Sequence, residues 1–135
     1  MAQTSPIQKD VYFSDFLFDF RTNPATQDLA RVTNEQSVLS SIRKILKTNH
    51  FEIPYNPYFG ANISHYLFEN FDQFTEIAMT EDIRFAITNY EPRVEILDIV
   101  VDGSPDTNSI DITVTVSIIN NPAPLTLTTT LTRVR

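Results

Sequence analysis

The sequence predicts an α+β fold in which an N-terminal extended arm and two to three helices pack on a C-terminal three-stranded antiparallel meander. Apolar residues recur at helical spacing from about residue 30 to residue 90, and they alternate with polar residues from about residue 93 onward. Turn-forming residues divide this second part into three segments. Because 135 residues is a usual length for one domain, we expect residues 1–135 to form a single domain, with a helical part over about 30–90 and a β-sheet part over about 93–135.

The first third of the chain predicts an arm followed by a helix. Residues 10–20 carry aromatic side chains at both parities, which indicates a short strand or an extended arm. Thr33 and Gln36 have the spacing of a capping box, which predicts a helix over about 34–48. We expect Asn49 to be its C-cap. One face of this helix is apolar and consists of Val38, Leu39, Ile42, Ile45 and Leu46.

The middle third predicts a loop and further helical structure. Pro54 and Pro57 exclude a regular helix just after residue 50, and Asn62 can cap a second helix beyond that loop. Helical spacing continues over 73–90, so this region holds either two helices or one helix that bends near residue 72. Aromatic residues at helical spacing usually belong to a core. We assign four of them to it: Phe68, Phe71, Phe74 and Phe85.

The last third predicts the meander. Pro92 disfavours helical backbone at the residue before it, so the helix is expected to end there. In the strand that follows, the apolar residues change parity between Ile96 and Leu97, which indicates a β-bulge or burial on both faces. Turns are expected at 103–106 and 120–122. The final strand is an edge candidate, and its threonine row is either a solvent-facing surface or a site for strand addition.

Composition excludes several classes of function. A nucleic-acid-binding surface is basic, whereas this chain has a net charge of −7 and a pI near 4.6. The sequence also contains no run of 18 apolar residues, the length needed to span a membrane. The first ten residues lack the apolar region of a secretory signal. Two glycines and no cysteine leave no phosphate-binding glycine loop and no cysteine metal site, and His50 and His65 lack a ligand spacing. We therefore expect no nucleic acid, no membrane, no metal and no cofactor.

The acidic residues do not indicate catalysis. Glycoside hydrolysis needs two carboxylates on either side of a sugar, and 17 acidic residues will always provide some suitable pair. Glu69, Asp72 and Glu76 lie at helical spacing and are interpreted as a solvated helix face. There is also no GxSxG nucleophile elbow. We expect no catalytic residues and a protein that is not an enzyme.

A strong acid and a strong base flank Pro92 at the predicted helix–strand junction. Glu91 and Arg93 either lie in water, where an ion pair contributes ~0–1 kcal/mol, or mark an interaction site. The residues alone leave both interpretations open.

The order of motifs along the chain resembles that of a known family. Glu91-Pro92-Arg93-Val94, after a helix and before a β-meander, is similar to the EPR motif of the contractile-tail baseplate wedge and sheath-initiator family, which has counterparts in type VI secretion baseplates. The resemblance covers about residues 10–135, with two departures: Gln27 stands where a glycine is expected, and Ile53 where an arginine is expected. The other matching segments are Asn23-Pro24-x-Thr26-x-Asp28-Leu29, Val38-x-x-Ser41-Ile42-Arg43, Ile45-Leu46-x-Thr48-Asn49, Pro57-x-x-Gly60, Leu67-Phe68-Glu69-Asn70-Phe71 and Ser117-Ile118-Ile119-Asn120.

The resemblance implies a structural protein of the inner baseplate wedge of a contractile phage tail. Its helical part and EPR motif would bind other wedge proteins, and its C-terminal sheet would template the first ring of tail sheath by strand addition. The tail tube or hub is a further expected partner. The implied location is the virion tail baseplate, after synthesis and assembly in the host cytoplasm. The expected partner-binding residues are Glu91, Pro92, Arg93, Leu125, Thr126, Leu127, Thr128 and Thr130.

Two alternatives remain beside this interpretation. One is a lysozyme-like peptidoglycan hydrolase of the tail, an activity that has been attached to the family. The other is a bacterial adaptor that uses the same fold.

Overall fold

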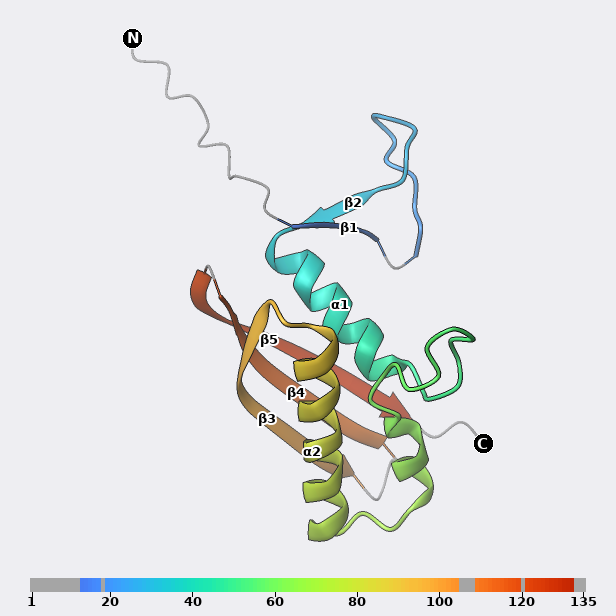
Figure 1. Cartoon of the computed structure of the whole chain (residues 1–135), viewed down its shortest axis with the longest axis vertical. Coiled ribbons are helices and arrows are strands. Elements are labelled where there is room, and N and C mark those ends of the chain that lie inside the picture. Colours follow the sequence, from blue (N-terminus) through green and yellow to red (C-terminus); the bar gives the residue numbers. More distant parts are fainter. Residues whose placement is uncertain (1–12, 18, 105–108, 120, 133–135) are drawn as a thin grey trace.

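A computed structural model of the chain describes residues 13–17, 19–104, 109–119 and 121–132 (Figure 1). The elements in chain order are β1 (Ser14–Phe16), β2 (Arg31–Thr33), α1 (Glu35–Lys47), the 3-10 helix η1 (Ile63–Phe68), α2 (Gln73–Tyr90), β3 (Val94–Ser104), β4 (Ser109–Ile118) and β5 (Asn121–Thr132). The predicted α+β class is confirmed. Within the described ranges, no helix is long and apolar enough to cross a lipid bilayer.

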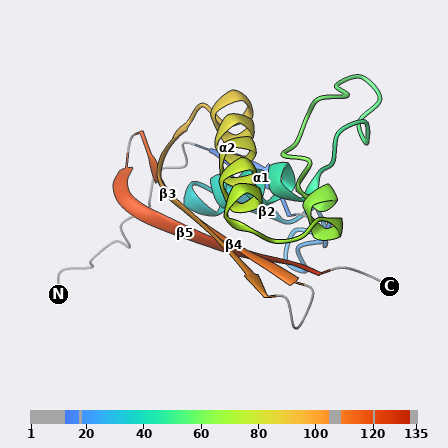
Figure 2. The same ribbon diagram turned by 90° about the horizontal axis from the view of Figure 1, so that it is seen from below.

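The three C-terminal strands form one antiparallel sheet in the order β3-β4-β5, which confirms the predicted meander. The register of β3 against β4 shifts between Ile96 and Asp98, so the change of parity in the sequence marks a β-bulge at Leu97. The predicted turns at 103–106 and 120–122 lie partly outside the described residues. The helices cover one face of the sheet (Figure 2).

The core lies between that covered face and the helices. Ile112, Val114 and Val116 of β4 are fully buried, because alternate residues of the central strand point toward the helices. Ile42 of α1 and Ile83 of α2 are also fully buried against this layer. Removing such apolar surfaces from water is the main contribution to folding, at roughly 25 cal/mol per Å².

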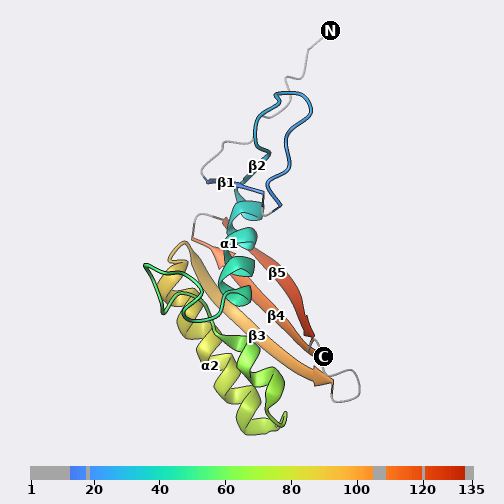
Figure 3. The ribbon, with the colours of Figure 1, turned by 90° about the vertical axis from the view of Figure 1, so that its right-hand side faces the viewer.

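The N-terminal arm pairs with the segment that precedes α1. Strand β1 runs antiparallel to β2, and the pair lies beyond the N-terminal end of α1 (Figure 3). Lys44 Nζ donates a hydrogen bond of 2.8 Å to Asp15 Oδ2, which ties β1 to α1. In the loop between the strands, Gln27 has φ 55°, a left-handed conformation that a glycine adopts without strain. The glycine expected at this position therefore has a structural reason.

Both predicted caps of α1 are wrong. The N-cap is Asn34, which has φ 51° and makes no side-chain capping hydrogen bond, so Thr33 and Gln36 form no capping box. Its Oδ1 instead accepts from the Phe13 N–H at 3.4 Å, because the arm packs against the start of the helix. At the other end the C-cap is Thr48, whose Oγ1 donates to the Lys44 carbonyl at 2.7 Å. Asn49 is engaged with Glu52.

The middle region contains two separate helices, so the first of the two predicted arrangements is confirmed and the single bent helix is not. The first is only the short η1, which buries Ile63 and Tyr66. The second, α2, begins after Asp72, whose Oδ1 accepts from the Thr75 N–H at 2.8 Å. A Cβ at Gly103 would overlap the ring of Phe71, so a glycine there lets this ring pack against β3.

Three of the four aromatic residues assigned to the core lie at the surface. Phe68, Phe74 and Phe85 are 67%, 81% and 71% exposed, so that prediction is wrong for them, whereas Phe71 packs partly against the core. For Phe74 and Phe85 the physical reason is that α2 carries apolar residues on two opposite faces, whereas Phe68 is the last residue of the short η1. The face that meets the sheet consists of Thr75, Met79, Ile83, Ala86 and Ile87.

Candidate functional site

The first predicted site lies at the corner where α2 ends and β3 begins. The Glu91 N–H donates to the Ile87 carbonyl at 2.8 Å and completes the last turn of α2. Two residues later the Arg93 carbonyl accepts from the Ile119 N–H at 3.1 Å, which holds the chain beside the end of β4. Pro92 fixes the backbone between these anchors. The corner is therefore held on both sides of the proline.

Within this corner, Glu91 and Arg93 bind each other. Arg93 Nε donates to Glu91 Oε1 and Arg93 Nη2 donates to Glu91 Oε2, both at 2.5 Å. This is the two-pronged guanidinium–carboxylate geometry, which gives strong charge-assisted hydrogen bonds. The Glu91 side chain is only 2% exposed, and that of Arg93 is 33% exposed. The interpretation in which both side chains lie in water is therefore wrong for Glu91.

The surroundings keep this pair ionised. Burial alone would raise the pKa of Glu91, but hydrogen bonds from Arg93 and Ser41 and the positive charge of Arg93 outweigh it and hold this pKa below its ordinary value. The hydrogen bond to Glu91 in turn raises the pKa of Arg93, although its partial burial acts against this. The Arg93 guanidinium also lies over the ring of Phe13, 5.0 Å from its centre.

These contacts make the corner a junction of three parts of the chain. Ser41 belongs to α1, and Phe13 belongs to the arm that pairs with Asn34. Glu91 thus faces inward, Pro92 is exposed and Arg93 is half-buried. Sequence reasoning selected these residues but missed their partners, because Ser41 and Phe13 lie far away in the chain.

The second predicted site is the edge strand β5. Leu125 and Leu127 point toward the helices, and Thr126, Thr128 and Thr130 are exposed on the opposite face. In the sheet order β3-β4-β5, only β4 neighbours β5 among the described strands. The Asn121 amide donates to Glu35 Oε1 at 3.1 Å, which fastens the start of β5 to α1. The edge position predicted from the sequence is confirmed.

One feature of β5 was not predicted. Thr129 lies on the helix-facing side, is 6% exposed and pairs in register with the fully buried Ile112. Its Oγ1 has no hydrogen-bond partner among the described residues. The sequence offers a signal for this position, since Thr129 stands at the parity of the leucines.

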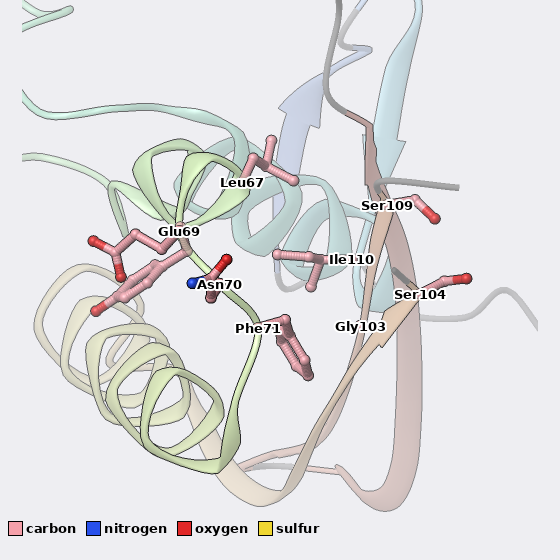
Figure 4. A pocket seen from close by; sticks show the side chains of 9 residues that line it. Leu67, Glu69, Asn70, Phe71, Gly103, Ser104, Ser109 and Ile110 are labelled. Atoms are coloured by element: carbon pink, nitrogen blue, oxygen red, sulfur yellow. The ribbon is translucent and has the colours of Figure 1, made fainter. Parts of the chain in front are cut away.

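The acidic residues do not form a paired site. Glu69, Asp72 and Glu76 are exposed, as predicted, but the first two precede α2 and do not share a helix face with Glu76. A hollow of about 490 Å³ lies between the η1–α2 connection and the β3–β4 hairpin (Figure 4). Of the described residues that line it, Glu69 is the one carboxylate. The described part of the chain also holds no group of three or more side chains suited to a metal ion.

Comparisons with known proteins identify the family. The family described as baseplate wedge protein gp25 matches residues 32–123, which include the corner and end near the start of β5. The baseplate wedge protein gp25 of Enterobacteria phage T4 is 31% identical over 96 residues, which are 71% of this chain and 73% of the T4 protein.

Solved structures agree on the fold. A candidate tail lysozyme from Geobacter sulfurreducens superposes with a TM-score of 0.67 at 22% identity, over 75% of this chain and 92% of that one. A chain of the sixfold-symmetrised baseplate of the anti-feeding prophage superposes with a TM-score of 0.64 at 17% identity, over 87% of this chain and 83% of that one. At these identities the likeness shows the fold alone. The match over residues 32–123 and the T4 relative decide the assignment: the chain belongs to the gp25 family of baseplate wedge proteins.

Proposed function

We propose that this chain is a structural component of the inner baseplate wedge of a contractile phage tail, and that it templates the first ring of tail sheath by strand addition to β5. The protein is part of the virion tail baseplate and is assembled in the host cytoplasm. The observation that carries the sheath role is the contrast between the two edges of the sheet.

The β3 edge is poorly suited to accept another strand. A β-bulge at Leu97 interrupts it, and Glu95, Asp98 and Asp102 are exposed along it. Bulges and charges are the usual devices that prevent pairing at an edge.

The β5 edge has neither device over residues 125–132. This stretch contains four threonines in alternate outward positions and no charge, proline or glycine, and its register against β4 is regular from Pro124 to Thr132. Pro124 lacks an N–H, so it limits strand addition near the start of β5. A strand of the sheath protein would extend the sheet beside Leu125, Thr126, Leu127, Thr128 and Thr130.

The corner serves the second role, binding of other wedge proteins. Pro92 and the exposed third of Arg93 offer the contact surface, and the buried Glu91 sets the direction of the guanidinium. A preset arginine fork suits a carboxylate or a backbone carbonyl of a partner. The tail tube or hub is a further partner in this proposal.

The sheath role is tested by replacing Thr128 with proline in the full chain and examining tails by electron microscopy. Proline removes one backbone N–H and stiffens the strand, so we expect complete baseplates that carry no sheath. Thr128→Val is the matched control, because it keeps the N–H and suits an exposed strand. A thermal melt of both variants separates lost strand addition from lost folding. Normally sheathed tails from a folded Thr128→Pro protein would refute the role.

A further inference from the structure

The outward face of α2 carries an apolar stripe that the fold does not use. Phe74, Ile77 and Phe85 are 81%, 55% and 71% exposed, and Ala78 is also exposed. At about 100° per residue, Phe74, Ala78 and Phe85 lie within about 40° of one another, with Ile77 beside them. Exposed apolar patches of this kind mark interaction surfaces.

The stripe continues into a groove. A hollow of about 370 Å³ separates α2 from the segment 50–62, and its lining includes Tyr58, Asp82 and Phe85. Tyr58 is 67% exposed and its ring lies 5.9 Å from that of Phe51. The Tyr90 hydroxyl donates to the Tyr58 carbonyl at 2.9 Å and fastens this segment to α2. The groove therefore has a held aromatic wall.

Charge restricts what can cover this surface. Glu81 lies within the stripe, between Ala78 and Phe85, and is 69% exposed. Its contact with Arg84 is loose, with 3.8 Å between Arg84 Nε and Glu81 Oε1. Asp82, which accepts from the Tyr66 hydroxyl at 2.7 Å, adds a second carboxylate in the groove. A partner that covers two carboxylates without supplying cations would leave buried charges unpaired, which is strongly unfavourable.

A second copy of this chain fits that requirement poorly. Helix α2 carries three acids, Glu76, Glu81 and Asp82, against the single base Arg84, so its net charge is −2. Each chain as a whole has a net charge of −7. Two such faces would repel each other.

We propose that the outward face of α2, together with the groove beside it, docks an amphipathic helix of another protein, with a lysine or arginine of that helix opposite Glu81 and Asp82. The stripe runs along α2 for about three turns beside the groove, and the apolar face of a partner helix can lie along such a surface. The surface is distinct from the corner and from β5, so it adds a third contact to those in the proposed function and does not depend on sheath initiation.

The experiment uses the full chain and two synthetic helical peptides of 18 residues with the same leucine stripe. One peptide has lysine at the centre of the stripe and the other has glutamate. Fluorescence anisotropy should show that the lysine peptide binds at least about tenfold more tightly, and that Phe85→Ala weakens its binding by about tenfold, as loss of an aromatic anchor does. Glu81→Lys should reverse the preference between the two peptides. Thr115→Ala, on the far face of the sheet, is the control and should change neither affinity.

Several outcomes would overturn the proposal. They are absence of binding by both peptides, equal binding of both, or a preference that Glu81→Lys leaves unchanged. Analytical ultracentrifugation provides a further one: a dimer that Phe85→Asp converts to monomer would make this face a self-interface. Thermal melts of the variants should be unchanged, because Phe85 is mostly exposed. Sheath attachment, measured separately, distinguishes failure here from failure of the sheath role.

Discussion

Replacing Arg93 with alanine should lower the free energy of unfolding, because the carboxylate of Glu91 is then buried without its partner. Glu91 is 2% exposed and accepts both hydrogen bonds from Arg93. Breaking a buried pair by removing one member costs about 3–5 kcal/mol. The Arg93 side chain is 33% exposed, so water can partly replace it, and we expect the lower end, a loss of about 3 kcal/mol of unfolding free energy.

The measurement is urea unfolding at pH 7, with Arg84→Ala as the matched control. Arg84 and Glu81 are 48% and 69% exposed and 3.8 Å apart, so losing that pair should cost less than about 0.5 kcal/mol. The Glu91→Met/Arg93→Met double variant should lose less than the sum of the single variants, because it leaves no unpaired charge.

The pH dependence provides an internal check. The pKa of Glu91 is lower in the folded than in the unfolded protein, so the pair stabilises fully above the ordinary carboxyl value of 4.5 and loses this effect as the pH falls through the folded pKa. The difference between the wild type and Arg93→Ala should therefore narrow in acid. A loss below about 0.5 kcal/mol that does not vary with pH would refute the structural role of the pair and leave the corner as a contact site alone.

Three further predictions concern separate positions. Thr129→Val should raise the unfolding free energy by about 1 kcal/mol in urea unfolding, because it removes a buried hydroxyl without a described partner; a loss of stability would mean that this hydroxyl is satisfied. Gln27→Gly should raise it by up to about 1 kcal/mol in the same assay, because a glycine adopts the φ of 55° at this position without strain. Its control is Gln36→Gly inside α1, where the greater freedom of glycine in the unfolded chain should lower the unfolding free energy by about 1 kcal/mol. The purified chain should give no clearing in a peptidoglycan zymogram, with hen egg lysozyme as the positive control; clearing that Glu69→Gln abolishes would instead support the hydrolase alternative.

Local patterns predicted much of the fold. The three strands of the C-terminal sheet and the bulge at Leu97 follow from alternation and from a single change of parity, and the end of α2 follows from Pro92, but β2 was not predicted. These features depend on the chain's own geometry and on neighbours a few residues apart, which is why sequence patterns predict them. The ordered motifs around Glu91-Pro92-Arg93 likewise predicted the family, since each motif is a short run of residues.

Tertiary structure decided what local patterns leave open. Both Phe74 with Phe85 and Met79 with Ile83 satisfy the helical period, and only the position of the sheet determines which face of α2 is buried. Glu91 and Arg93 are two residues apart, so an ion pair between them could be suspected from the sequence alone. Its burial could not, because Ser41 and Phe13 approach the pair from other parts of the chain. The sequence by itself determined the two α-helices, the C-terminal strands, the corner and the family. Burial depends on contacts between distant segments, so it was decided only when those segments packed together.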